Sequence, residues 1–142
     1  MSVKISVYKD FNVYPGLRHI SMSQNSGEEF YHNLLNKSFY EAYISNSKLI
    51  IDLDNTAGYP PSFIDESIGN LVYDFGLNNV KNVLDIISAQ EPNWIEYINT
   101  HTFPLWEQRR VNGQTPVKTA QHDPWYILDK NNNIMLNDGY TM

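Results

Sequence analysis

Residues 49–63 read LIIDLDNTAGYPPSF, and the fold that we expect is built around them. The run from Leu49 to Ile51 is apolar without a break, which is typical of a central strand covered on both faces. A loop with Gly58 and two prolines follows, and an apolar stripe at helical spacing begins at Phe63. We therefore expect a central strand that leads through a loop into a helix.

Further elements are predicted on both sides of this stretch. Residues 3–9 alternate apolar and polar side chains, which predicts a half-buried strand, and a short strand is expected near residues 19–22. Ser26 is expected to be the N-cap of a helix, with Glu29 completing a capping box. Residues 82–88 predict another strand, and a last helix is expected to begin near Pro92. Alternating strands and helices predict an α/β sandwich.

The pattern changes after His101. Residues 125–129 and 134–137 predict a β-hairpin around an asparagine-rich turn. We expect a domain over residues 1–101 and, over residues 102–142, a C-terminal appendage packed on the same domain. The appendage is expected either to cover a sheet edge or to mediate self-association as a homodimer through its aromatic residues Phe103, Trp106, Trp125 and Tyr126.

Composition argues against several classes of function. The 142 residues carry a formal net charge of -6 and include no cysteine, so nucleic-acid binding, disulfides and thiolate metal sites are not expected. The four histidines are widely separated, so neither a metal nor a cofactor is expected. No apolar run approaches the roughly 18 residues of a membrane span, and the N-terminus has no apolar signal region. We expect a soluble, cytoplasmic protein.

Asp52 and Asp54 raise the alternative of an enzyme. A strand followed by D-x-D-x-T is similar to the HAD-type phosphatases, in which the first aspartate attacks phosphorus and Mg²⁺ neutralises the phosphate. The chain offers no well-placed lysine or acidic pair downstream, and the motif begins at residue 52 although it normally opens the domain. The other interpretation is that both aspartates are loop carboxylates at the end of a strand. We therefore expect a protein that is not an enzyme.

A longer part of the chain, about residues 3–99, resembles a known family. The motifs GLR, SGEEF and IIDLDNTAGY are followed by Ser62-Phe63 and then by a helix containing Gly69. This order resembles the bacterial STAS-like domain of unknown function (DUF4325), whose members read approximately GPR, SGEEF, VDLDGTxGY, SSFLxE and GGL. The motif positions that we expect to be structural are Gly16, Arg18, Ser26, Gly27, Glu29, Gly58, Phe63 and Gly69. The chain departs from the pattern at Leu17, Asn55, Pro60-Pro61 and Asn70.

The resemblance implies both a fold and a function. The implied fold is a STAS-like sandwich with a mixed sheet of four to five strands and helices mainly on one face. The implied function is that of a non-enzymatic module for protein interaction and regulation, like the anti-sigma-factor antagonists. The implied partner is a GHKL-type ATPase or histidine-kinase-like protein. A structural subunit without any switch is the other non-enzymatic alternative.

Ser62 is expected to be the N-cap of the helix after the central strand, since serine is a favoured N-cap. Ser62 is also a candidate phosphorylation site, because the resemblance implies a phosphorylated Ser or Thr at this place, as in STAS antagonists; capping alone is the other interpretation. A phosphate would add about -1.5 to -2 charge near Asp54, Asp65 and Glu66, which favours an electrostatic off-switch.

The loop and helix start around Ser62 are the expected partner-binding surface. Its candidate residues are Thr56, Tyr59, Ser62, Asp65 and Glu66. For Tyr59 the alternative is a ring buried against the helix. Arg18 is expected to pair with Asp52 or Asp54 across the sheet ends.

Overall fold

The computed structural model describes residues 2–137, and its centre is a three-stranded parallel sheet. The strands are β1 (Ser2–Ser6), β2 (Lys48–Asp52) and β3 (Leu84–Ile87), in the order β1-β2-β3. Strands β4 (Trp125–Leu128) and β5 (Ile134–Asn137) pair with each other in a separate antiparallel sheet. The α/β class and the hairpin are confirmed. The expectation of one mixed sheet of four to five strands is wrong for the described residues.

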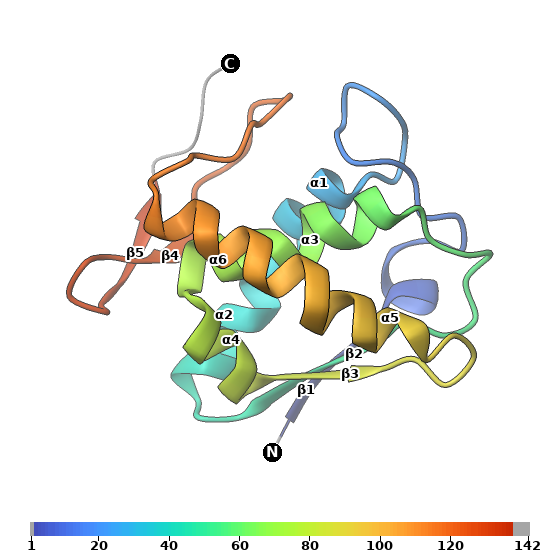
Figure 1. Ribbon diagram of the computed structural model, residues 1–142, viewed down its shortest axis with the longest axis horizontal. Coiled ribbons are helices and arrows are strands. Elements are labelled where there is room, and N and C mark those ends of the chain that lie inside the picture. The colour runs from blue at the N-terminus through green and yellow to red at the C-terminus, as the bar shows by residue number, and fades with distance from the viewer. Residues whose placement is uncertain (1, 138–142) are drawn as a thin grey trace.

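The helices form three runs that lie side by side over one face of the parallel sheet (Figure 1). The first is a continuous run of α1 (Gly27–Phe30), the π-helical turn η2 (Tyr31–Leu35) and α2 (Asn36–Ile44). The second consists of α3 (Pro61–Phe75) and α4 (Leu77–Val83). The third is another continuous run, formed by α5 (Asn93–Tyr97), the π-helical turn η3 (Ile98–Thr102) and α6 (Phe103–Val111). The position 101/102, at which we divided the chain, lies inside this last run.

The core lies between the sheet and the helices. Ile5 and Ile51 occupy paired positions on β1 and β2, and both point to the helical side. The aromatic rings of Phe30 and Phe63 stack on each other at 5.6 Å between α1 and α3. These fully buried side chains supply the main apolar stabilisation of the fold.

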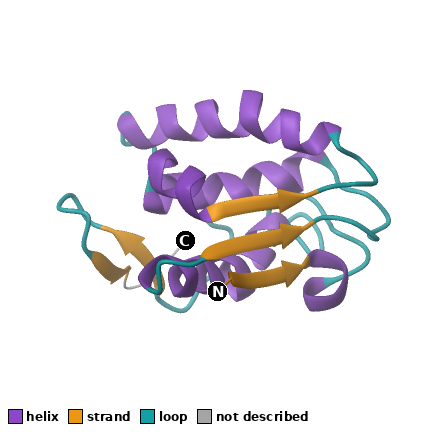
Figure 2. Ribbon diagram, turned by 90° about the horizontal axis from the view of Figure 1, so that it is seen from below, coloured by secondary structure: helices purple, strands orange, loops and turns teal. Residues whose placement is uncertain are grey.

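On the opposite face of the sheet, no helix formed by residues 2–137 crosses the strands (Figure 2). Its residues at the centre of the sheet are Lys4, Ile50 and Asp85, which are register partners on the three strands. Lys4 and Asp85 are exposed and Ile50 is partly buried. The expectation that β2 is covered on both faces is therefore wrong, and the alternation of side chains in this sheet is that of a half-buried surface.

Several expected boundaries also differ. The first strand ends at Ser6 because the Ser6 hydroxyl accepts a hydrogen bond from Lys9 N and starts the π-helical turn η1 (Val7–Phe11). Residues 19–22 form a turn, in which Met22 N donates to His19 O, and not a strand. The expected strand at 82–88 begins only at Leu84, because α4 occupies the residues before it.

Candidate functional site

At the junction between β2 and α3, the helix begins two residues earlier than the sequence predicts. Pro60 is the N-cap and Pro61 the first helical residue, so Ser62 occupies the second position. Proline is favoured at the first position because its fixed φ suits the helix and its missing N–H would have no helical partner there. The expectation that Ser62 caps α3 is therefore wrong. The Ser62 side chain is partly buried, and within residues 2–137 its hydroxyl has no hydrogen-bond partner.

The two aspartates of the D-x-D motif close loops at the carboxyl end of the sheet. Asp52 Oδ1 accepts a hydrogen bond from Asp54 N at 2.9 Å. The Asp54 carboxylate accepts from Ala89 N and Gln90 N at 3.1 and 3.0 Å, which ties the loop after β2 to the loop after β3. Asn55 follows with a φ of 75°, a left-handed conformation that glycine, the family's residue here, adopts freely and asparagine tolerates.

Tyr59 packs inward from the same loop. Its hydroxyl donates to Leu53 O at 2.7 Å, and its ring contacts the rings of Phe63 and Trp94. Burial raises the pKa of Tyr59 well above its ordinary value. Of the two expectations for Tyr59, the structure therefore supports the ring that is buried against the helix. Thr56 is turned toward its own loop, where its hydroxyl accepts from Gly58 N at 3.3 Å.

Asp65 and Glu66 are buried, at 5% and 2% exposed, and do not form an accessible acidic surface. Arg18 lies against both, with its guanidinium 3.2 Å from Glu66 Oε1 and 3.6 Å from Asp65 Oδ2. Thr102 also donates to Asp65, at 2.8 Å. The expected pairing of Arg18 with Asp52 or Asp54 is therefore wrong, because Arg18 reaches α3 and not the sheet ends. Asp65 and Glu66 thus attach two segments to α3. Both bind the N-terminal loop (residues 12–25) through Arg18, and Asp65 binds the last helical run through Thr102.

A second polar cluster surrounds Glu28, a residue of the SGEEF motif that sequence analysis did not select. Its side chain is 0% exposed, and its Oε1 accepts from His19 Nδ1, Ile20 N and Thr119 Oγ1 at 3.2, 3.1 and 2.7 Å. Its Oε2 accepts from Thr119 N and His122 Nε2 at 3.0 and 2.6 Å. Burial alone would raise the pKa of Glu28, but these hydrogen bonds outweigh it and hold the pKa well below the ordinary value.

A buried lysine lies beside this cluster. Lys118 Nζ donates to Asn70 Oδ1 at 2.8 Å and lies over the rings of Tyr31 and Trp125. Asp74 accepts a 2.5 Å hydrogen bond from the Tyr31 hydroxyl. Burial lowers the pKa of Lys118 and raises the pKa of Asp74 to about 6. Asn70, one of the departures from the family pattern, is thus the residue that binds this lysine.

Two motif glycines are explained by close packing. A Cβ at Gly27 would lie 2.7 Å from Phe63 O, where α1 meets α3. A Cβ at Gly69 would lie 2.2 Å from Cε2 of Trp106, so the absent side chain makes room for the indole of α6. Ser26 caps α1 as predicted, since its hydroxyl accepts from Glu29 N at 3.1 Å.

The aromatic residues of the C-terminal part pack against the helices of the same chain. Phe103, Trp106 and Trp125 are buried, and the Tyr126 ring stacks on Tyr40 at 3.6 Å. Strand β4 contacts α2 and α3, so the hairpin packs against these helices and not along an edge of the parallel sheet.

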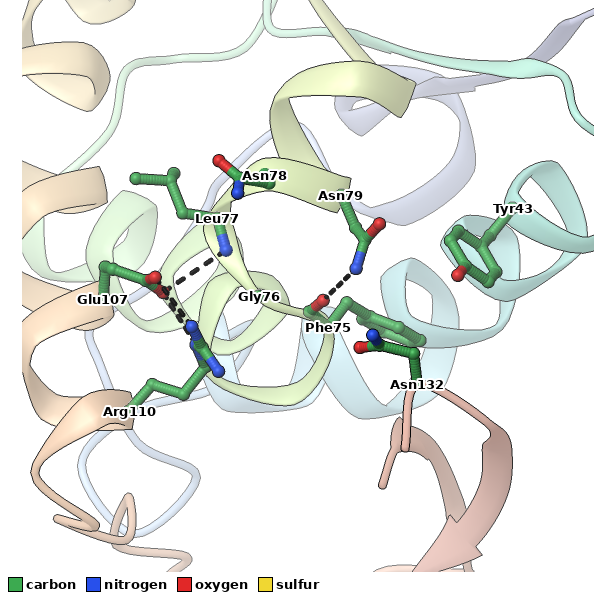
Figure 3. A pocket seen from close by; sticks show the side chains of 9 residues that line it. All are labelled: Tyr43, Phe75, Gly76, Leu77, Asn78, Asn79, Glu107, Arg110 and Asn132. Atoms are coloured by element: carbon green, nitrogen blue, oxygen red, sulfur yellow. Dashed lines mark hydrogen bonds and ion pairs between the residues drawn. The ribbon is translucent and has the colours of Figure 1, made fainter. Parts of the chain in front are cut away.

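A cavity of about 330 Å³ lies where α3 passes into α4 (Figure 3). Its charged residues pair with each other: the Glu107 carboxylate accepts from Arg110 Nε and Nη2 at 2.7 Å and from Leu77 N at 3.3 Å. The Arg110 hydrogen bonds lower the pKa of Glu107 below its ordinary range. The other polar residues of the lining are Tyr43 and asparagines such as Asn79, which donates to Phe75 O. Within residues 2–137, no cluster of three or more His, Asp or Glu side chains has the geometry to hold a metal ion.

Comparison with known families bears on residues 26–94, from the N-cap of α1 to the start of α5. Residues 26–94 match the STAS-like domain of unknown function (DUF4325). The resemblance expected over about residues 3–99 is thereby confirmed over these residues, which carry Ser26, Gly27, Gly58, Phe63 and Gly69. The chain matches no curated protein and no solved structure. No helix among the described residues is long and apolar enough to cross a membrane.

Proposed function

We propose that this STAS-like chain is a non-enzymatic regulatory module that binds a protein partner and is switched by phosphorylation at Ser62. The observation that carries the proposal is the Ser62 hydroxyl at the start of α3, which is partly exposed and has no hydrogen-bond partner within residues 2–137. A hydroxyl that stabilises nothing in the folded chain can be modified without breaking an internal contact.

The surroundings of Ser62 support an effect on binding more than an effect on the fold. Pro60 and Pro61 have no N–H, and Phe63 N donates to Pro60 O, so the helix start offers few free donors for a phosphate. Arg18 is held by Asp65 and Glu66. The added charge would therefore project to solvent and to the partner.

The partner that the family resemblance suggests is a GHKL-type ATPase or histidine-kinase-like protein. Such an enzyme would supply the phosphoryl group to Ser62. The surface that it would contact comprises the loop from Thr56 to Pro61 together with Ser62, because Asp65 and Glu66 are buried. Phosphatase chemistry has less support, since both carboxylate oxygens of Asp54 are engaged by backbone N–H groups.

Affinity capture from the native host tests the proposal. Wild type, Ser62→Glu and Asn78→Glu are compared as baits, with mass spectrometry of the bound proteins. Asn78 is a matched control because it is exposed and occupies the second position of α4, as Ser62 does in α3. Wild type and Asn78→Glu should enrich the same ATPase-domain protein, and Ser62→Glu should not. Equal enrichment by all three baits would contradict the control of binding by phosphorylation at Ser62. Capture of no protein would contradict the proposal that the chain binds a protein partner.

A further inference from the structure

Another cavity, of about 590 Å³ and here called the α6 cavity, lies where the N-terminal loop, α3, α6 and the segment after α6 meet. The N-terminal loop and the segment after α6 extend on the same side of the molecule (Figure 1). The lining of the cavity includes Arg18, Glu66, Arg109, Gln114, Thr115 and Val117. Apart from Glu66, these residues lie outside residues 26–94, so the cavity is largely built by parts of the chain beyond the matched domain.

Arg109 brings a positive charge to this cavity that no carboxylate of residues 2–137 pairs with. Its guanidinium carbon lies 4.9 Å from the centre of the Trp106 ring. The next residue, Arg110, differs, because its Nε and Nη2 both donate to Glu107 at 2.7 Å. A guanidinium carries five N–H donors and binds carboxylate and phosphate groups through two parallel hydrogen bonds. The Arg109 side chain is therefore available to bind an anion in the cavity.

Glu66, the carboxylate in the lining, is compensated by other residues of the fold. It is only 2% exposed. Its Oε1 accepts a hydrogen bond from Arg18 at 3.2 Å, and its Oε2 accepts one from Asn70 at 3.0 Å. Lys118 interacts electrostatically with the same carboxylate. Glu66 therefore has its charge balanced and both oxygens engaged, and it leaves the Arg109 guanidinium without a partner.

The segment after α6 adds neutral donors and an apolar surface. The side chains of Gln114 and Thr115 are exposed, and within the described part of the chain neither makes a hydrogen bond. The Gln114 amide and the Thr115 hydroxyl can therefore donate to a ligand. Val117, which also lines the cavity, is 63% exposed. Donors beside an exposed apolar side chain suit a small molecule that carries an anionic group on an apolar body.

We propose that the α6 cavity is a binding site for a small organic anion, whose phosphate or carboxylate group pairs with Arg109 and whose apolar body lies against Val117. Gln114 and Thr115 donate further hydrogen bonds to the anionic group. The inference goes beyond the proposed function and does not depend on it, because Ser62 does not line this cavity.

An NMR titration with three probes that share one aromatic ring tests the proposal. Phenyl phosphate and benzoate carry an anionic group, and phenol is neutral. Wild type should bind at least one of the two anions with a Kd of about 1 mM or less, and the tighter of the two identifies the group that Arg109 prefers. Phenol should bind at least about tenfold more weakly than that anion. Binding of neither anion, or equal binding of phenol, overturns the proposal.

Two pairs of variants locate the site. Arg109→Gln and Arg110→Gln each remove one positive charge from α6, but only Arg109 lines the α6 cavity. Arg109→Gln should weaken binding of the tighter anion at least about tenfold, and Arg110→Gln should leave it within about twofold of wild type. Val117→Asp places a like charge in the lining and should also weaken binding. Val111→Asp should not, because Val111 is 70% exposed and does not line the cavity.

Circular dichroism verifies that each variant is folded. Equal affinities of Arg109→Gln and Arg110→Gln overturn the proposal, as do equal affinities of Val117→Asp and Val111→Asp. The second pair tests the site even if Arg109→Gln fails to fold. All four replacements leave Ser62 unchanged, so their outcome is separate from that of the capture experiment.

Discussion

Replacing Glu28 by glutamine should destabilise the protein far more than the same replacement at its neighbour Glu29. Glu28 is fully buried and its carboxylate accepts five hydrogen bonds, from His19, Ile20, Thr119 through two atoms, and His122. Glu29 is only partly buried, and within residues 2–137 its carboxylate makes no hydrogen bond. The two residues are adjacent and both replacements remove one negative charge. The difference between the two variants therefore measures the contribution of the hydrogen bonds around Glu28.

The magnitude follows from the geometry of the glutamine amide. Its oxygen can keep the three contacts of Oε1, but its nitrogen then faces Thr119 N and His122 Nε2. His122 can change tautomer and accept from the new amide, whereas the Thr119 amide stays without a partner. One unpaired buried donor and the loss of charge on the remaining bonds together give a cost of about 2–4 kcal/mol for Glu28→Gln. The cost of Glu29→Gln should be about 0.5 kcal/mol or less.

Urea unfolding followed by tryptophan fluorescence measures the unfolding free energies of both variants. Equal slopes of the transitions would show that the variants unfold in the same way as wild type. A Glu28→Gln variant within about 0.5 kcal/mol of Glu29→Gln would refute the buried cluster as a source of stability.

Three further changes have defined outcomes. Gly69→Ala should lower the unfolding free energy by about 1–3 kcal/mol because its Cβ overlaps the Trp106 indole, although alanine favours helices. Calorimetry should show a smaller cost of Gly69→Ala when Trp106 is also replaced by leucine. An unchanged cost in that double variant would contradict the overlap. Tyr59→Phe should cost about 1 kcal/mol through the lost bond to Leu53 O, while the exposed Tyr14→Phe should be neutral in the same urea assay. Burial lowers the pKa of His32 from 6.5 to about 2, so the unfolded chain binds a proton below pH 6.5 that the folded chain does not. This residue therefore makes stability fall as pH decreases from 6.5 toward 4, by up to about 1.4 kcal/mol per pH unit. In His32→Phe, the unfolding free energy should therefore depend less on pH between 6.5 and 4 than it does in wild type. The same pH dependence in both proteins would contradict the lowered pKa of His32.

The sequence predicts those elements whose signals are local. The apolar run before Asp52, the serine and glutamates at 26–29 and the two runs around the asparagine turn each correspond to an observed strand, helix start or hairpin. Each depends on neighbouring residues along the chain. Pro60-Pro61 also has a local signal, proline at the first helical position, and giving it more weight than the serine would have placed Ser62 correctly.

The polar clusters could not be predicted in the same way. Glu28 and His122 are separated by 94 positions, and Asn70 and Lys118 by 48, so no spacing along the chain indicates either contact. Asp65 and Glu66 are consecutive on α3, and only the packing of the last helical run and of Arg18 against that helix buries both. The sequence shows that Asn70 departs from the family pattern, but it does not indicate that Lys118 is the residue that Asn70 binds.

One affinity measurement would decide whether phosphorylation at Ser62 switches the binding of a partner. Isothermal titration calorimetry of the captured ATPase-domain protein would compare wild type, Ser62→Glu and Asn78→Glu. We expect Ser62→Glu to weaken binding at least about tenfold, equivalent to about 1.4 kcal/mol, and Asn78→Glu to leave the affinity unchanged. Equal affinities for wild type and Ser62→Glu would contradict the switch.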